Sequence, residues 1–330
     1  MNDVSIIIPA YNAEATLKEC LQSVTSLDWS NEIEVILVND SSTDRTAEIA
    51  AAFPDVKVFH IPHSGAARAT NTGIKTARFD IIALVDADAV LEKDWLQKIV
   101  PVLNDPQVAA VGGCPITANK TIIGKIAGYD VELRLARAPA DIDHISTTNA
   151  VYRRQILFDI GLLSEDMKAG YDVDLSRRLK SAAHKLILNK DARCRHYWKD
   201  NIKDYIKQQY NYAYYRMTLT RKFGRTHDQV TVPGMILQVP FAAAVVLFAI
   251  FGSLKLSWAP LALLSLPLIH LPETFSLLVK KRDSAVLFMP LLFTLRNLTW
   301  LWAAAVWGIH FLTGSVPRAA SQPRPGSSRK

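Results

Sequence analysis

Short apolar runs alternate with segments of helical spacing along the first part of the chain. Each run ends at polar or turn-forming residues, as buried strands do, whereas the segments between them repeat apolar side chains every three or four positions. The predicted strands are residues 4–8, 33–38, 56–60 and 81–85, and the predicted helices are residues 13–26, 43–52 and 66–77. Alternating strands and helices predict a parallel sheet between two helix layers, a three-layer α/β fold.

The pattern is less regular in the middle of the chain. Residues 199–223 are rich in Tyr, Lys and Arg, which suits an amphipathic helix that lies on a bilayer surface, with an ordinary surface helix as the alternative. The other predicted elements are strands near residues 108–112 and 146–152, and helices at residues 122–136 and 172–183.

Three apolar segments near the C-terminus are about as long as a membrane span needs to be. The first two, residues 233–252 and 257–279, carry their charges at the ends. The third, residues 285–312, holds a proline, Arg296 and Asn297 near its middle, where a charge is costly in lipid. We therefore expect two spans followed by either a broken span or a re-entrant pair of half-helices.

This division predicts a soluble domain (1–198), an interfacial region (199–230), a membrane domain (231–314) and a disordered basic tail (315–330). The net charge of +7 and the pI near 9.2 agree with it, because the basic residues flank apolar segments. That placement favours an anionic membrane surface over nucleic acid. The flanking residues are Arg221, Lys222, Arg225, Lys280, Lys281, Arg282, Arg318, Arg324, Arg329 and Lys330.

Charge and cysteine patterns also predict the cellular location. Basic clusters before the first span and after the second place both on the cytoplasmic side. The three cysteines lack zinc-site spacing and fit a reducing compartment. The apolar run at residues 4–9 is too short for a signal peptide and lacks a basic flank. We expect a multi-pass protein of the cell membrane with its soluble domain in the cytoplasm.

Polar residues follow several predicted strands directly, at the edge where parallel α/β sheets bind ligands. Asp86 and Asp88 come one residue apart after the strand at residues 81–85. Two such carboxylates can share a hard divalent cation and its bound phosphates. A solvated turn is the alternative for this pair alone.

Three further segments suit a nucleotide. Asp40 lies one residue outside an apolar run, so we expect it to be free to face a base or ribose, while Ser42 or Asp44 caps the next helix. Arg68 and the helix that starts near residue 66 can meet a phosphate. Loop and capping roles are the alternative for each. The first strand offers backbone amides and an aromatic face through Pro9, Ala10, Tyr11 and Asn12.

Taken in order, these segments resemble glycosyltransferase family 2, a large inverting family with the nucleotide-binding GT-A fold. The similarity covers roughly residues 4–200. It implies a divalent cation, Mn²⁺ or Mg²⁺, bound mainly by Asp88 and also by Asp86, and a nucleotide-diphosphate sugar as donor, with UDP favoured. The donor-binding residues that it implies are Pro9, Ala10, Tyr11, Asn12, Asp40, Arg68, Asp86 and Ala87.

The same resemblance implies a catalytic base. Residues 170–175 look like the family's Gly-Glu-Asp-x-Asp-Leu segment, whose first aspartate is the base, so Asp172 takes this role. Tyr171 stands where the family has glutamate, which leaves Glu165 and Asp166 as rival bases. Capping of the following helix is the alternative role for Asp172.

His196 resembles the histidine that closes the metal site in part of the family, and a structural histidine is the alternative. Residues 147–150 resemble a segment that lines the acceptor side. We therefore assign Thr148, Asn149 and Arg153 to the acceptor.

These roles predict inverting transfer of one sugar to a lipid-linked acceptor in the synthesis of cell-surface polysaccharide or glycolipid. Residues 208–212 lack the Gln-x-x-Arg-Trp segment of processive synthases, and the predicted spans are too few for a polymer channel. One alternative is a polyprenyl-phosphate monosaccharide synthase, with Arg134, Arg137, Arg153 or Arg154 as phosphate partners. Another, suggested by Tyr171, is an inactive nucleotide-sugar-binding scaffold. The apolar segments also permit a homo-oligomer.

Overall fold

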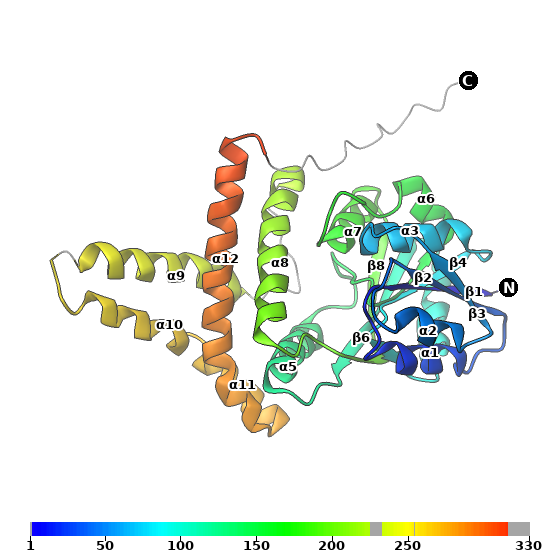
Figure 1. Cartoon of the computed structure of the whole chain (residues 1–330), viewed down its shortest axis with the longest axis horizontal. Helices are drawn as coiled ribbons and strands as arrows, with labels where there is room; N and C mark the ends of the chain where they lie inside the picture. The colour runs from blue at the N-terminus through cyan, green and yellow to red at the C-terminus, as the bar shows by residue number, and fades with distance from the viewer. Residues whose placement is uncertain (1, 225–232, 254, 316–330) are drawn as a thin grey trace.

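The computed structural model describes residues 2–224, 233–253 and 255–315. The predicted basic tail lies outside the described residues except for Ser315, and Arg225 lies outside them too. Figure 1 shows an α/β part joined by one long helix to a group of apolar helices.

The α/β part is built on one mixed eight-stranded sheet with the strand order β3-β2-β1-β4-β7-β6-β8-β5. The first four strands pair in parallel, whereas β7 is antiparallel to both β4 and β6. The strands are β1 (Val4–Ala10), β2 (Ile33–Asn39), β3 (Val56–His60), β4 (Ile81–Val85), β5 (Ala89–Leu91), β6 (Val108–Thr117), β7 (Asn149–Arg153) and β8 (Lys185–His196).

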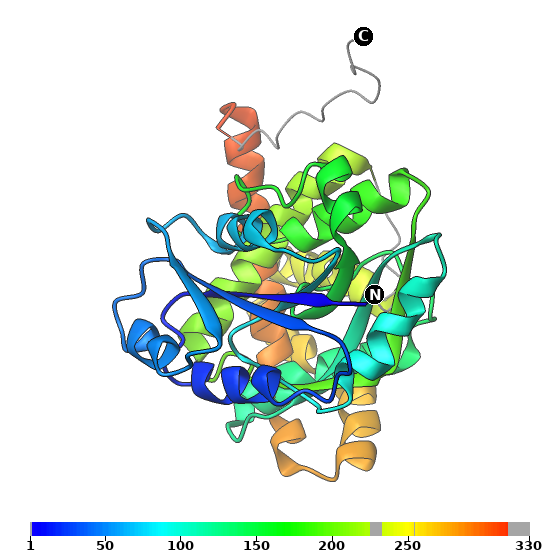
Figure 2. The same ribbon diagram turned by 90° about the vertical axis from the view of Figure 1, so that its right-hand side faces the viewer.

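Helices cover both faces of this sheet, which confirms the predicted three-layer α/β fold (Figure 2). Apolar side chains of α1 and α4 pack on one face, and those of α3, α6 and α7 on the other. The helices are α1 (Leu17–Thr25), α2 (Thr46–Ala51), α3 (Ala66–Thr76), α4 (Trp95–Ile99), α5 (Ile122–Arg137), α6 (Arg154–Ile160), α7 (Tyr171–Ser181), α8 (Ile202–Phe223), α9 (Pro233–Gly252), α10 (Ser265–Leu268), α11 (Leu271–Lys281) and α12 (Met289–Leu312).

The side chains of β1 alternate between the two cores. Ile6 and Ile8 belong to the core that contains Trp95, whereas Ile7 belongs to the core beneath α3 with Ile74. All five side chains are fully buried. Burial on both faces explains why this strand reads as a continuous apolar run.

The sequence pattern did not predict β8. This strand carries charged side chains along its second half, and several of them are exposed. The apolar signal of a buried strand is therefore diluted. Because β8 pairs in parallel with β6 and antiparallel with β5, it carries His196 back to the end of β4, next to the residues that follow it.

Helices α8 and α12 lie side by side and run in the same direction (Figure 1). Trp300 Nε1 donates a hydrogen bond to Gln209 Oε1 at 3.1 Å, and Trp307 Nε1 donates one to Thr218 Oγ1 at 3.0 Å. The predicted amphipathic segment is thus a helix packed along α12. Its placement on a bilayer surface stays a prediction.

Helix α12 is continuous through its middle, contrary to the expected broken or re-entrant segment. Its Arg296 and Asn297 are each only 4% exposed. Arg296 Nη2 donates to Gln238 Oε1 at 3.0 Å, Arg296 Nη1 lies 3.6 Å from Asp130 Oδ2, and Asn297 Nδ2 lies 3.2 Å from His270 Nε2. Because these polar groups find partners inside the protein, the helix does not need to break around them.

Two helical segments of the described chain are long and apolar enough to cross a membrane, Ala259–Lys281 and Ser284–Leu312. The first of them is a succession of short helices that includes α10 and α11. A shorter apolar helix covers Leu237–Gly252. Length and composition thus permit membrane spans in the region where the sequence predicts them.

Replacement of Gly73 by alanine tests the contact between α3 and β1. A Cβ atom on Gly73 would lie 2.3 Å from Cγ2 of the fully buried Ile7. We expect Gly73→Ala to lower the free energy of unfolding by about 1–3 kcal/mol through overpacking. The matched control is Gly308→Ala in α12, where a new Cβ meets nothing within 4 Å. Thermal unfolding of the purified variants checks this, and equal melting temperatures would contradict the close packing.

Candidate active site

The carboxyl ends of four parallel strands meet at one edge of the sheet. The register pairs Ala10 with Asn39, Asn39 with His60, and Ile7 with Leu84. The segments that follow β1, β2, β3 and β4 therefore begin beside one another. Candidate site residues from four separate stretches of the sequence therefore share this edge.

Asp86, Asp88 and His196 form a tight group there. One potential ligand atom of each lies within 4.8 Å of those of the other two. His196 Nε2 is 3.0 Å from Asp88 Oδ1. The pairing of Ala89 with His196 places the imidazole beside the acidic turn, and the ring of Trp198 packs against it with the centroids 4.3 Å apart.

Strong electrostatic interactions act within this group. Burial, and then the charge of Asp88, raises the pKa of Asp86 to about 6. Burial also acts to raise the pKa of Asp88, but His196 outweighs it and holds that pKa below its usual range. Burial acts to lower the pKa of His196, but Asp88 outweighs it and the pKa is raised. Two carboxylates this close are stabilised by a positive charge between them.

The group fits a divalent cation. Among the described residues, His196 Nδ1 is buried without a hydrogen-bond partner. Neighbouring ligands of an octahedral ion with bonds of about 2.1 Å lie about 3 Å apart. The 3.0 Å separation of Asp88 Oδ1 and His196 Nε2 matches that spacing. The two carboxylates also suit Mn²⁺ or Mg²⁺ as donors.

An exposed aromatic surface lies near the ends of β1 and β3. Tyr11 is 48% exposed, and its ring centroid lies 4.3 Å from that of His63. Asn12 has a φ of 49°, and its Oδ1 accepts a hydrogen bond from Thr43 N at 2.8 Å. That bond ties the loop after β1 to the loop after β2. Pro9 and Ala10 lie within β1, so Tyr11 is the side chain of this segment that is open to a flat ligand.

The side chain of Asp40 is not free, contrary to our expectation. It is only 3% exposed, and its Oδ1 accepts a hydrogen bond from Ser64 N at 2.7 Å while its Oδ2 accepts one from Gly65 N at 2.9 Å. His63 Nδ1 lies 3.0 Å from Oδ2. The carboxylate thus holds the turn before α3, where Gly65 has a φ of 92°. A direct contact of Asp40 with a nucleotide stays a prediction.

Arg68 of α3 points toward Glu165. Arg68 Nε lies 3.4 Å from Glu165 Oε2, and the guanidinium side chain is 60% exposed. Glu165 Oε1 also accepts a hydrogen bond from the buried Asn71 at 2.9 Å. These contacts tie Glu165 to α3, which makes it a poor rival to Asp172 as a base.

Asp172 lies in the first turn of α7 and is 21% exposed. Its Oδ2 is 3.2 Å from His144 Nε2, and its Oδ1 accepts a hydrogen bond from Val173 N at 2.8 Å. Its charge helps to raise the pKa of Asp86, so it lies within electrostatic reach of the group of Asp86, Asp88 and His196. The residue at the cap position of α7 is Gly170, which makes the capping alternative for Asp172 wrong.

Comparison with known proteins identifies the family. Residues 5–161 match the family model described as glycosyl transferase family 2. Residues 5–161 therefore carry a glycosyltransferase family 2 segment.

Several curated relatives resemble this glycosyltransferase over part of their length. The chain is 27% identical over 222 residues to the pre-mycofactocin glycosyltransferase of Mycobacterium tuberculosis and 32% identical over 176 residues to the poly-beta-1,6-N-acetyl-D-glucosamine synthase of Staphylococcus epidermidis. It is 27% identical over 196 residues to the glycosyltransferase AglE of Haloferax volcanii. These matches cover 64%, 50% and 57% of this chain, but only 46%, 42% and 64% of the relatives.

A solved structure shares the fold over nearly the whole chain. The mannosyltransferase PcManGT from Pyrobaculum calidifontis, in complex with GDP-Man and Mn²⁺, aligns with a TM-score of 0.57 and 22% identity. The alignment covers 93% of this chain and 86% of that one. The likeness in fold therefore extends past the family 2 segment into the C-terminal helices.

Thr148 contacts the group of Asp86, Asp88 and His196. Its Oγ1 donates a hydrogen bond to Asp86 Oδ2 at 2.9 Å, and its carbonyl accepts one from Asp86 N at 3.1 Å. We predicted Thr148 on the acceptor side, whereas its side chain orients a carboxylate that is predicted to bind the metal.

The two other acceptor candidates have partners within the protein, and their contact with an acceptor stays a prediction. Asn149 is 2% exposed, and its Nδ2 donates to Cys194 Sγ at 2.7 Å. Arg153 pairs in register with Ile81, at the end of β4 that lies opposite Asp86. Its Nε donates to the carbonyl of Val108 at 3.1 Å, so it holds a loop at the far edge of the sheet.

Sequence reasoning missed His144, the residue in contact with Asp172. It lies in an irregular segment before β7, and no motif or periodicity marks it. Only the packing of this segment against α7, where Ile145 N donates to Ser176 Oγ at 3.1 Å, brings the two together.

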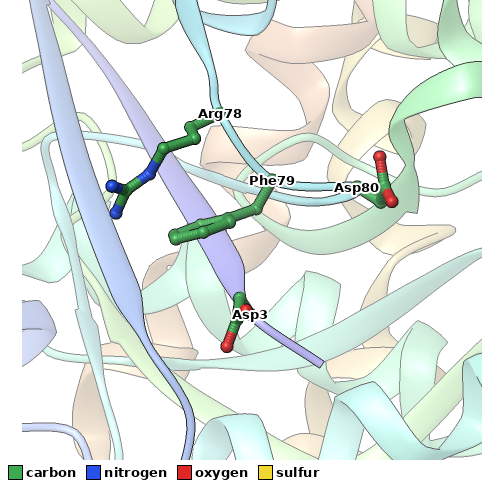
Figure 3. Close-up of a pocket in the computed structure, with 4 residues that line it drawn as sticks. All are labelled: Asp3, Arg78, Phe79 and Asp80. Atoms are coloured by element: carbon green, nitrogen blue, oxygen red, sulfur yellow. The ribbon is translucent and has the colours of Figure 1, made fainter. Parts of the chain in front are cut away.

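A separate pocket lies at the opposite edge of the sheet. Asp3, Arg78, Phe79 and Asp80 line it (Figure 3). These residues come just before β1 and β4, at the amino ends of both strands. The Arg78 guanidinium lies 4.4 Å from the centre of the Phe79 ring and pairs with Glu32. This pocket is remote from the metal-binding group and has no part in the site.

Substitution of Thr148 tests its support of Asp86. Thr148→Val keeps the shape but removes the hydroxyl that donates to Asp86 Oδ2. We expect the affinity for Mn²⁺ to fall by about tenfold, as is usual when a hydrogen bond to a metal ligand is lost. Titration calorimetry with Mn²⁺ measures it. Thr72→Val on α3 is the control, because that hydroxyl bonds only the backbone of its own helix. Unchanged affinity in Thr148→Val would show that Asp86 needs no such support.

Proposed function

We propose that this chain transfers one sugar, with inversion, from a nucleotide-diphosphate donor to a lipid-linked acceptor. The observation that carries the proposal is the group of Asp86, Asp88 and His196 at the edge of the sheet, with Asp172 in electrostatic reach. A cation site beside a strand-end surface suits a nucleotide diphosphate, and a separate carboxylate suits a base.

Each residue then has a chemical task. Asp86, Asp88 and His196 would hold the cation, and the bound ion supplies positive charge for the departing diphosphate. Asp172 would accept the proton of the acceptor hydroxyl as the acceptor oxygen bonds to the anomeric carbon. The bond from that carbon to the diphosphate oxygen breaks, and the nucleoside diphosphate leaves. His144, 3.2 Å from Asp172, would fix the orientation of this carboxylate.

The donor side would lie along the loops after β1, β2 and β3. The exposed Tyr11 ring suits a nucleotide base, and Arg68 beside the amino end of α3 suits a phosphate. UDP is the proposed donor nucleotide, although the structural neighbour was solved with GDP-Man. Turnover of a panel of UDP- and GDP-sugars distinguishes the two donor nucleotides.

The C-terminal helices support a membrane location and hence a lipid-linked acceptor. Large apolar side chains of α9 to α11 are widely exposed, among them Leu237, Leu264 and Phe275 at 67–69%. Contiguous apolar surface of this kind marks a membrane or a protein partner. We propose that these helices anchor the chain in the cell membrane, with the catalytic domain in the cytoplasm.

One observation favours a second candidate, a polyprenyl-phosphate monosaccharide synthase. Arg134 of α5 pairs with Asp130 at 3.2 Å, but its Nε is buried without a hydrogen-bond partner among the described residues. A phosphate oxygen would satisfy that donor. A phosphate acceptor is already anionic, so it would need little help from Asp172.

Donor turnover tests the proposed function. We expect the purified full chain to hydrolyse or transfer from one of the UDP-, GDP- and dTDP-sugars only when Mn²⁺ or Mg²⁺ is present. Asp88→Ala should abolish this turnover because it removes a metal ligand. Asp172→Asn should lower transfer to a hydroxyl acceptor by on the order of a thousandfold, which is the usual effect of a general base.

The variant Asp172→Asn also distinguishes between the candidate functions. Transfer to undecaprenyl phosphate that survives Asp172→Asn would favour the polyprenyl-phosphate synthase. Mass spectrometry of the lipid product identifies the linkage. Donor binding without any turnover would contradict an enzyme and favour the inactive scaffold suggested by Tyr171.

Membrane extraction tests the anchor. We expect the full chain to stay in the membrane pellet after an alkaline carbonate wash and to be released by detergent, because its exposed apolar helices require lipid. A peripheral protein and a known integral protein serve as controls in the same fractions. Release by carbonate alone would contradict membrane-spanning helices.

A further inference from the structure

Helix α5 lies between the sheet and the apolar helices (Figure 1). On the sheet side it packs closely against the end of β6, because a Cβ atom at Gly128 would lie only 1.9 Å from Thr117 Oγ1 and 2.5 Å from Trp198 Nε1. On its other side, Ile126 shares a hydrophobic core with Leu277 of α11. The helix therefore contacts both the sheet and a segment that is apolar enough to cross a membrane.

The end of β6 lies next to one of the predicted metal ligands. Thr117 pairs in register with His196, and Ala118 N donates a hydrogen bond to the carbonyl of His196 at 3.0 Å. Trp198, against which Gly128 packs, has its ring centroid 4.3 Å from that of His196. The backbone of His196 is thus held by β6 and its imidazole ring by Trp198. Helix α5 packs behind both.

Glu132 joins this strand end to the apolar helices. It lies four residues after Gly128, on the same face of α5. Its Oε1 accepts hydrogen bonds from Thr117 N at 2.7 Å and from Thr117 Oγ1 at 2.6 Å. Its Oε2 pairs with Nζ of Lys281, the last residue of α11. The side chain of Glu132 is only 14% exposed, so a largely buried carboxylate is engaged by the sheet through one oxygen and by α11 through the other.

Other polar contacts of α5 reach the same connection after α11 without touching β6. Lys125 Nζ pairs with Asp283 Oδ2 at 2.9 Å, and Tyr129 Oη donates a hydrogen bond to the same oxygen at 2.9 Å. These contacts hold α5 against the residues that follow α11. Glu132 differs from Lys125 and Tyr129 because it also bonds the strand end beside the cation group.

The support of His196 from outside the cation group is mainly backbone support. Its Nδ1 is buried without a hydrogen-bond partner among the described residues, so no such bond fixes the ring through its second nitrogen. Metal-binding histidines usually rely on a hydrogen bond of that kind for their orientation and affinity. The position of the imidazole therefore depends on the packing of Trp198 and on the strand end that Glu132 holds.

We propose that Glu132 is a positioning residue for the cation site. It holds the end of β6 beside His196, and Lys281 in turn holds the Glu132 carboxylate. This inference rests on the proposed function, because it assumes that Asp86, Asp88 and His196 bind the cation. Tight metal binding then requires that α11 is seated on α5, although neither Glu132 nor Lys281 belongs to the cation group.

Titration calorimetry with Mn²⁺ on the full-length protein in detergent tests this role. Glu132→Ala should weaken Mn²⁺ binding by about fivefold, and Lys281→Met by about threefold, since both act on the ligands through intervening residues. Glu132→Gln should bind more tightly than Glu132→Ala, because its amide oxygen can still accept from Thr117. The double variant Glu132→Ala/Lys281→Met should bind as weakly as Glu132→Ala, because the lysine acts through the carboxylate.

Lys125→Met is the matched control, because it removes an ion pair between α5 and Asp283 but no contact with β6. It should keep the Mn²⁺ affinity of the wild type. Thermal unfolding of each variant distinguishes positioning from general support: a purely structural Glu132 would lower the melting temperature and leave the Mn²⁺ affinity of the folded protein unchanged.

Three results would overturn the positioning role. These are wild-type Mn²⁺ affinity in Glu132→Ala, wild-type affinity in Lys281→Met, and a loss in Lys125→Met equal to that in Lys281→Met. The milder Lys281→Met keeps the test decisive if Glu132→Ala does not fold. Absence of Mn²⁺ binding by the wild type would instead overturn the cation site of the proposed function, and this inference with it.

Discussion

Repulsion between two neighbouring carboxylates is the constraint on which this site depends. Asp86 and Asp88 lie together where burial disfavours charge on both, and His196 offsets only part of that cost. The arrangement persists because the rest of the fold holds it. Thr148 orients Asp86, and Trp198 packs on the imidazole of His196. The pairing of β5 with β8 fixes the distance between Asp88 and His196. A bound cation would relieve the repulsion between the two carboxylates. The structure of this group therefore agrees with the proposed metal-dependent transfer.

The second constraint is mechanical and lies in α8. Its end is tied to α7 through Lys222 and the buried Asp174, whose remaining oxygen bonds Ser164 and Arg178. Gln209 and Thr218 of α8 also bond Trp300 and Trp307 of α12. The same helix therefore contacts the element that carries Asp172 and the apolar helices that suit a membrane.

The strands that form the sheet edge could be predicted from sequence because their signals are local. β1 and β4 are buried on both faces, so they appear as continuous apolar runs, and the polar residues that follow them must lie at the carboxyl edge. The approach of His196 to Asp88 was predicted only from the family resemblance, since β8 carries too many exposed charges to be recognised as a strand. The contacts of Thr148, Asn149 and Arg153 depend on strand register, which the resemblance did not give.

The sequence by itself determined the α/β class, the strand-end motifs, the family 2 segment and the position of the apolar helices, because each rests on side-chain periodicity or on residues close together in the chain. The tertiary structure decided which carboxylates are free and which are engaged. Asp40 is occupied by the turn before α3, Glu165 is held by α3, and Asp172 meets His144. These contacts join residues that are distant in sequence, and no local pattern encodes the geometry that brings them together.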